Sequence, residues 1–400
     1  MFSLIKYLKG NYFELFITFL IFTNLFPIYF PNWLYYVGLG VILLKMLRCR
    51  VKLDKNNTIS FILIGCAFLS SLMGGFLDFR LLLFFLIIYI TYPAYTSLRW
   101  HMFKKKLLKN FFIGYAFVTL ISLIAKVLGI NNRLLKWNED ELAMNAVHEF
   151  SGFASHPMWV SCAAALSALY FVYMFFTSET KSKFIKGFYC LMFFVSLYII
   201  VISASRSALG LTIICTFLLL RWSLKKISKI AKYIVILGVA SIIAFPILQD
   251  NMGSMIKKQN YQQETGKTSR DEKWGELIEE FKESPIIGVG FAVHGYGNNK
   301  AIGRYETGSG WLAILGQMGM IGFVTALLMW KRAITPLRIL RHDKWMIMIY
   351  CAFIFFSIHS IFEGYMIQCG WYLCLVCWMI VGVLIENKKY YKFLKGNPVQ

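Results

Sequence analysis

Runs of apolar residues recur along the whole chain, separated by short polar or basic stretches. A run of about 17–22 apolar residues, wound into a helix, crosses a hydrocarbon core of roughly 30 Å. Of the 400 residues, 58% are hydrophobic and only 16% are charged, which excludes a water-soluble domain of ordinary composition. Long apolar runs in a bilayer form helices, because a helix satisfies all its own backbone hydrogen bonds. The chain is therefore predicted to be an all-α integral membrane protein.

Twelve of these runs are interpreted as transmembrane helices. Because twelve is an even number, both termini lie on one side of the membrane. The positive-inside rule makes that side the cytoplasm, since it then holds most of the 42 lysines and arginines in short loops. The expectation is one polytopic domain over residues 1–400. The predicted spans are 12–30, 33–47, 58–75, 80–97, 111–130, 157–177, 187–204, 207–221, 233–249, 309–330, 345–366 and 369–386.

The formal net charge of +22 follows from this topology. The basic clusters are short loops between spans, among them 98–110 and 331–344. Short basic loops beside a membrane contact anionic lipids. The charge therefore indicates membrane lipids as partners, and nucleic-acid binding is excluded as its explanation.

The largest predicted external loop covers residues 250–308, between the ninth and tenth spans. Its segment SRDEKWGELIEEFKES (269–284) has apolar residues at helical spacing, which predicts a short amphipathic helix with Ser269 as its N-cap. The next residues, PIIGVGF, include Gly288 and Gly290, which allow a tight backbone. An external loop of this size is large enough to carry part of a functional site.

A single arginine, Arg206, interrupts the apolar sequence between about residues 187 and 220. It falls in a predicted tight connection between two spans, at their outer ends. Such an arginine can extend to the lipid headgroups with no other role. The alternative is a functional site, because ionisable residues close to the membrane commonly mark one. Small hydroxyl residues that could hydrogen-bond an anion surround the arginine, namely Ser203, Ser205 and Ser207.

Four short motifs accompany this arginine along the chain. They are Ser203-Ala-Ser-Arg206-Ser-Ala-Leu-Gly210, Ser269-Arg270-x3-Trp274-x10-Pro285-Ile-Ile-Gly288-Val-Gly290-Phe291, Phe150-Ser-Gly152-Phe153-Ala-Ser-His156-Pro157 and Leu312-x6-Gly319-Met-Ile-Gly322. In their order and topology, over roughly residues 110–385, they resemble the O-antigen ligase/polymerase superfamily of bacterial membrane glycosyltransferases.

The resemblance implies an inverting, metal-independent transferase of the bacterial cytoplasmic (inner) membrane, with its active site facing the periplasm or the outside. The implied donor is a glycan on a polyprenyl diphosphate, such as undecaprenyl diphosphate. The implied acceptor is a second carrier-linked glycan for a polymerase, or lipid A-core for a ligase. No nucleotide sugar or other cofactor is implied, and a chain-length regulator is a possible partner.

Two arginines match the family's positions, and the resemblance implies that both engage the donor diphosphate. Arg206 lies at the span junction, and Arg270 opens the helix of the large loop. Guanidinium groups suit this task, because they bind phosphate oxygens in pairs and stay charged near lipid. Many ligases also carry a His-Asn pair before the re-entering span. The sequence here reads Thr307-Gly308-Ser309-Gly310-Trp311, which favours a polymerase.

The acceptor hydroxyl requires a general base, for which several residues are candidates. His359 and Glu363 are four residues apart in the predicted span 345–366, so one helix face would present both. The alternative is a structural pair, in which Glu363 neutralises Arg206 and His359 satisfies a hydrogen bond in the core. His294 and Glu306 lie in the large loop, where ordinary solvated side chains are also expected.

Further residues at the outer face are candidates for binding sugars. His156 could contact the acceptor or cap a helix, and Ser309 stands at the position of the missing pair. Aromatic side chains stack on sugars, although packing and membrane-interface belts use the same residues. The aromatic candidates are Trp274, Tyr296, Tyr305, Trp311 and Tyr365.

A lipid flippase or transporter is the main alternative function, and an inactive scaffold of a polysaccharide machinery is another. Twelve spans with cytoplasmic termini are common among transporters, which are often built from two similar halves. The large external loop has no counterpart in the first half of this chain. The notable charges also gather at the outer surface, which favours an enzyme acting at the membrane surface.

Overall fold

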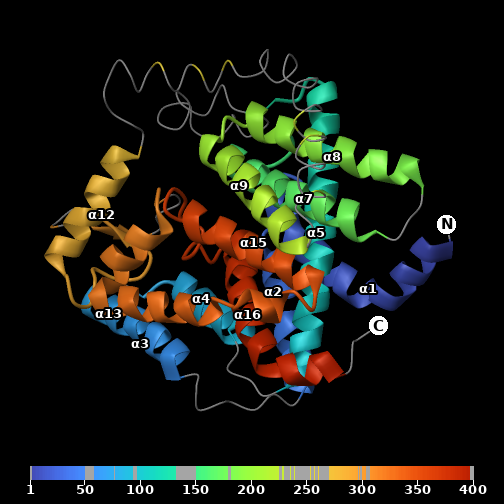
Figure 1. Ribbon diagram of the computed structural model, residues 1–400. Coiled ribbons are helices and arrows are strands. Elements are labelled where there is room, and N and C mark those ends of the chain that lie inside the picture. Colours follow the sequence, from blue (N-terminus) through green and yellow to red (C-terminus); the bar gives the residue numbers. More distant parts are fainter. Residues whose placement is uncertain are drawn as a thin grey trace. The chain divides into compact units, whose positions relative to one another are not determined.

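The computed structural model describes residues 2–49, 58–75, 77–92, 97–131, 150–178, 182–224, 270–295, 297, 300–302 and 307–396, with isolated positions between 228 and 260. In this part of the chain, thirteen α-helices accompany one 3-10 helix and one two-stranded antiparallel hairpin (Figure 1). The predicted all-α class is confirmed.

A helix occupies every predicted span except 233–249, which lies outside the described residues apart from isolated positions. The elements are α1 (Phe2–Phe22), η1 (Thr23–Leu25), α2 (Trp33–Arg48), α3 (Thr58–Met73), α4 (Phe79–Thr91), α5 (Leu98–Val127), α7 (Pro157–Thr177), α8 (Lys183–Ile202), α9 (Arg206–Ser223), α12 (Asp271–Glu283), β1 (Val293–His294), β2 (Ala301–Ile302), α13 (Gly310–Ala333), α14 (Leu337–Leu340), α15 (Lys344–His359) and α16 (Tyr372–Gly396).

Among the described residues, five helices are long and apolar enough to cross a membrane, namely α5, α7, α8, α9 and α13. The helices α3, α4 and α15 are apolar but shorter. The protein is therefore a multi-pass helical membrane protein. Its twelve-span count and its orientation stay predictions.

The chain divides into two compact units. The first comprises Met1–Leu34, Lys109–Gly266 and Leu340–Phe355, and the second comprises Tyr35–Leu108, Lys267–Ile339 and Phe356–Gln400. In the first unit, α7 packs against α8 and α9 and is buried on nearly all sides, as expected for a helix that is apolar all round. Arg206 belongs to the first unit and Arg270 to the second. Each arginine is accordingly described within its own unit.

In the second unit, α13 packs against α3, α12 and α16 (Figure 1). This helix is broken at Gly319, whose φ of 63° and ψ of −168° are not helical. The segment Pro285–Gly290 supplies the backbone partners that the break removes. Its amides at Val289 and Gly290 donate to the carbonyls of Gly316 and Gln317, at 3.1 and 3.2 Å.

The second half of α13 is held in the same way. The amide of Met320 donates to the Pro285 carbonyl at 2.8 Å, and that of Ile321 donates to Ile286 at 3.3 Å. A Cβ atom on Gly288 would overlap the Gln317 backbone, and one on Gly319 would overlap Ile286. The close backbone expected of PIIGVGF is therefore confirmed, and its partner is the broken helix.

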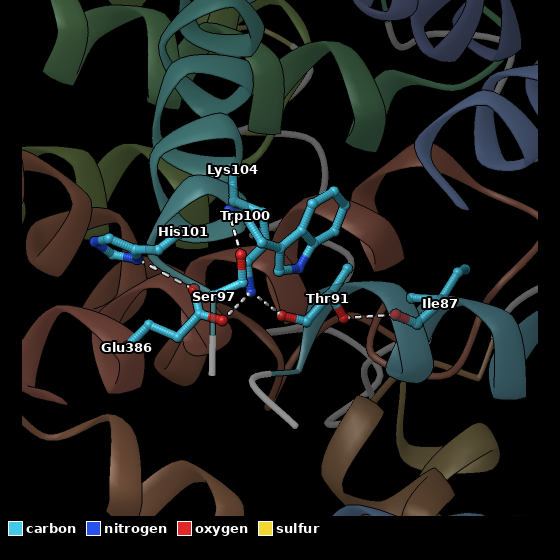
Figure 2. Close-up of polar contacts among 7 residues, drawn as sticks. All are labelled: Ile87, Thr91, Ser97, Trp100, His101, Lys104 and Glu386. Atoms are coloured by element: carbon cyan, nitrogen blue, oxygen red, sulfur yellow. Dashed lines mark hydrogen bonds and ion pairs between the residues drawn. The ribbon is translucent and has the colours of Figure 1, made fainter. Parts of the chain in front are cut away.

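The prediction that residues 98–110 form a loop is wrong, because these residues form the first turns of α5, whereas their cytoplasmic side stays a prediction. Three ionisable side chains from α5 and α16 meet there, fully buried (Figure 2). Lys104 Nζ lies 2.9 Å from Glu386 Oε1 and also donates to the Thr91 carbonyl at 2.8 Å. His101 Nδ1 lies 3.1 Å from Glu386 Oε2. These contacts join the first turns of α5 to α16 and to the end of α4.

The amphipathic loop helix is confirmed as α12, although it begins at Asp271 with Arg270 in the N-cap position. The expected N-cap, Ser269, lies outside the described residues. Leu277 on the predicted apolar face is 1% exposed, and α12 packs against α13. The close packing of α12 against α13 fixes the end of the loop that carries Arg270.

Candidate functional site

Arg206 is the first residue of α9, directly after a three-residue connection from α8. The predicted tight connection is thus confirmed. Ala204 in its middle has a φ of 53°, a left-handed conformation that is uncommon for a residue other than glycine. Its methyl group belongs to a small buried cluster with Val201, against which Leu209 packs. Such backbone conformations recur at functional sites and are held there by surrounding packing.

The polar residues of this junction differ in exposure. Arg206 is exposed, whereas Ser205 and Ser207 are half-buried. Ser203 is 2% exposed and forms the C-cap of α8, where its amide donates to the carbonyl of Ile199 at 3.1 Å. The junction therefore presents one guanidinium and two hydroxyl groups at the start of a helix, where backbone amides also favour anions.

Arg270, in the second unit, is held by the turn that follows α15. Its Nη2 atom lies 2.7 Å from Glu363 Oε1, and its Nε donates to the Phe362 carbonyl at 2.9 Å. The guanidinium carbon lies 5.8 Å from the centroid of the Phe362 ring. The Arg270 side chain is 34% exposed and the Glu363 side chain only 7%. The carboxylate therefore lies buried beneath a guanidinium that reaches the surface.

The prediction that His359 and Glu363 share one helix face is wrong. Helix α15 ends at His359, and Glu363 lies in the irregular turn beyond it. The carbonyls of this turn bond to distant donors, since Gly310 donates its amide to Ser360 and Glu363 at 2.8 and 2.9 Å. His359 is fully buried, with Nδ1 3.1 Å from the hydroxyl of Tyr365. Glu363 pairs with Arg270, a partner that was not predicted for it.

Residues 307–310 stand where many ligases carry a His-Asn pair, and here they pack against the turn. Ser309 caps α13 by accepting the Leu312 amide at 3.3 Å. Thr307 is 2% exposed, and a Cβ atom added to Gly364 would overlap its hydroxyl. The close packing of these residues against the turn fixes the residues that hold Arg270.

The aromatic candidates separate into two groups. Trp274 is half-buried, donates its indole N–H to the Gly308 carbonyl at 3.0 Å, and stacks on Phe362 at 6.4 Å between ring centroids. Trp311 instead donates to the Ser357 carbonyl and packs edge-on against Trp330. Trp274 thus lies beside Arg270, whereas Trp311 serves packing between helices.

The remaining predicted residues are spread more widely. His156 caps α7 by accepting the Met158 amide at Nδ1, so the alternative role of a cap is confirmed. His294 is half-buried in β1. Tyr296, Tyr305 and Glu306 lie outside the described residues. Phe362 was missed, because an isolated phenylalanine in a predicted span carries no signal that distinguishes it from core.

The end of the large loop is bonded to acidic side chains of α12. Glu280 is 0% exposed and accepts the Gly295 amide at Oε1, at 2.9 Å. Glu283 accepts the amide of Gly297 and pairs with Lys300. The contact with the Lys300 ammonium is the main reason that the pKa of the Glu283 carboxyl lies below its usual value, and the hydrogen bond from the Gly297 amide adds to it. Two carboxylates of α12 therefore anchor the end of the loop.

Comparison with known proteins adds one finding. No curated protein and no solved structure matches the chain. The family model described as O-antigen ligase matches residues 191–327, a range that includes Arg206, Arg270 and Trp274 but ends before His359 and Glu363. The match confirms the resemblance on which the two arginines were selected. Residues 191–327 of this multi-pass membrane protein are thus similar to the O-antigen ligase family.

Proposed function

We propose that this protein is a glycosyltransferase of the bacterial cytoplasmic membrane that takes a glycan from a polyprenyl diphosphate and transfers it at the outer face. The acceptor is a sugar hydroxyl, on a second carrier-linked glycan for a polymerase or on lipid A-core for a ligase. The absence of a His-Asn pair at residues 307–310 favours the polymerase.

The observation that carries this proposal is the guanidinium of Arg270, which reaches the surface at the start of α12 within the residues similar to the O-antigen ligase family. As the bond to the sugar breaks, the phosphate oxygen that was bonded to the anomeric carbon keeps the electron pair and gains negative charge. A fixed guanidinium stabilises that charge, and preset donors of this kind lower a barrier by a few kcal/mol. The half-buried rings of Trp274 and Phe362 beside it offer apolar faces to the adjoining sugar.

The reaction also needs a group that accepts the proton of the acceptor hydroxyl. His359 and Glu363 were both predicted for this role. In the structure each is almost fully buried and already bonded, His359 to Tyr365 and Glu363 to Arg270. The resting geometry thus favours leaving-group stabilisation by Arg270 as the main contribution of this site.

Purified full-length protein in lipid vesicles tests the proposal. The donor is the polyprenyl-diphosphate-linked repeat unit extracted from cells that lack this chain. Wild type should elongate it without ATP or added metal, and Arg270→Ala should lower the rate by about 10²–10³-fold. Lys282→Ala is the matched control, because this exposed lysine on the same helix pairs only locally with Glu279. Equal rates in Arg270→Ala and wild type would refute the role of Arg270.

The same vesicles separate the transferase from the flippase. A flippase moves an unaltered lipid from one leaflet to the other, and an ion gradient often drives such movement. Movement of intact donor with no new glycosidic bond would refute the proposal. Deletion of the protein in cells distinguishes the two transferases: single repeat units on the surface indicate a polymerase, and long chains stranded on the carrier indicate a ligase.

A further inference from the structure

Three contacts hold the guanidinium of Arg270. The Glu363 carboxylate and the Phe362 carbonyl accept its hydrogen bonds at 2.7 and 2.9 Å, and the Phe362 ring lies against it. All three groups come from one turn, and Glu363 there is 5% exposed. A substrate at the surface would meet the arginine before the carboxylate.

We infer that Glu363 is a positioning residue, which holds the Arg270 guanidinium in the orientation that binds the donor diphosphate. The inference rests on the proposed function for the identity of the anion. It replaces the prediction that Glu363 acts as a general base. A general base must reach the acceptor hydroxyl, whereas this carboxylate is only 7% exposed and is already paired with the arginine.

Positioning matters here because a free arginine side chain loses much rotational freedom when it binds an anion. A guanidinium already fixed by a carboxylate, a carbonyl and a ring loses less, so it binds the diphosphate more tightly. The pair also keeps the buried carboxylate compensated, since an isolated carboxylate with little exposure is strongly unfavourable.

The turn that carries Glu363 is itself fixed by the junction before α13. Gly310 donates its amide to two carbonyls of the turn, and Gly364 packs directly on Thr307. Trp274, one helical turn after Arg270, bonds to Gly308 in the same junction. Residues 307–310 therefore complete the support of Arg270 at the place where ligases carry a His-Asn pair.

Kinetics distinguish a positioning residue from a base. Glu363→Gln keeps an oxygen that accepts from Nη2, whereas Glu363→Ala removes it. With full-length protein and the extracted donor, we expect the activity of Glu363→Gln to stay within about threefold of wild type. Glu363→Ala should raise the donor KM by about tenfold, with most of the turnover retained at saturating donor and an unchanged pH profile. If Glu363→Gln instead slowed turnover by about 100-fold or more and removed the acidic limb of the pH profile, the inference would be overturned.

A second measurement does not depend on activity. Phenylglyoxal modifies accessible guanidinium groups, and mass spectrometry reports the modification of each arginine. Arg270 should react several times faster in Glu363→Ala than in wild type or Glu363→Gln, with Arg206 as the internal reference. Glu279→Ala is the matched control, because the Glu279 carboxylate lies on α12, the helix that follows Arg270, and pairs with Lys282. An unchanged rate at Arg270 in folded, monodisperse Glu363→Ala would overturn the inference.

The two measurements separate this inference from the proposed function. If wild type fails to elongate the donor while Arg270 becomes reactive in Glu363→Ala, the proposed function falls and the positioning role stands. If Glu363→Ala does not fold, Glu363→Gln and Glu363→Asp are measured in its place. Both preserve an acceptor for Nη2, and strong activity loss in both would contradict positioning.

Discussion

At the scale of single residues, the sequence indicates which side chains carry charge but not which partners they have. Arg270 and Trp274 were predicted from a motif, and the structure brings them together on Phe362. Glu363 pairs with Arg270, 93 positions earlier in the chain, and this pair was not predicted. Such pairings depend on how distant segments pack, which no local spacing records.

The buried cluster of Lys104, Glu386 and His101 gives a prediction at this scale. Lys104→Met and Glu386→Gln should each destabilise the protein by about 3–5 kcal/mol, because each leaves one buried charge without its counter-charge. The double variant should be more stable than either single one, since both charges are then absent. Thermal unfolding in detergent measures this, with Lys109→Met on the exposed side of α5 as the control. Additive losses in the double variant would contradict it.

At the scale of elements, the positions of helices follow from the sequence much better than their ends and breaks. Apolar runs predicted the spans because burial in lipid selects composition directly. The apolar pattern did not predict the helix at 98–110, where buried partners on α4 and α16 stabilise a basic segment as helix. The apolar pattern also did not predict the end of α15 at His359 or the break of α13 at Gly319, where backbone groups from distant segments replace helical hydrogen bonds.

The contact between Pro285–Gly290 and the broken helix gives a second prediction. Gly288→Ala should destabilise the protein by at least about 3 kcal/mol, because its φ of 88° is strained for alanine and the new methyl group would overlap Gln317. Gly275→Ala in α12 is the control, since nothing lies within 4 Å of an added Cβ there. The control should be neutral or stabilising by up to about 1 kcal/mol. Thermal unfolding in detergent compares the two, and equal midpoints would contradict the prediction.

The anchor of the loop at Glu283 gives a prediction on pH. Folding lowers the pKa of this carboxyl. Its contribution to the free energy of unfolding is therefore complete above pH 4.5, the ordinary pKa, and is lost as the pH falls through the pKa of the folded state. Glu283 is 32% exposed, so the effect should stay below about 1 kcal/mol. Wild type should exceed Glu283→Gln in thermal stability at pH 7, and the difference should shrink below pH 4.5 and vanish once the pH is well below the folded pKa. A difference that persists at low pH would contradict this.

At the scale of the whole molecule, composition was sufficient to predict a multi-pass helical membrane protein. The number of spans and the cytoplasmic termini stay predictions, because 233–249 lies outside the described residues apart from isolated positions. The two arginines of the predicted donor clamp belong to different compact units. Their joint action on one diphosphate is a prediction that kinetics can test.

Arg206→Ala and Arg270→Ala should each lower kcat/KM by about 10²–10³-fold if both engage the same leaving group. The effects of residues that act as a unit are strongly non-additive. The kcat/KM of the double variant should therefore be only slightly below that of the more impaired single variant. Initial rates with the extracted donor measure this. Losses that multiply in the double variant would show two independent roles and refute the shared clamp.

The interruption of α13 at Gly319 has a consequence for how the isolated segment behaves. Glycine can also adopt the right-handed helical conformation, and the groups that take over the missing hydrogen bonds come from residues 285–290. A synthetic peptide of residues 305–335 in bilayers, separated from those residues, should therefore recover the missing bonds by forming one straight, continuous rod. Oriented infrared or solid-state NMR measurements on such a peptide would reveal that shape. The bend thus belongs to the assembled fold and is absent from α13 on its own.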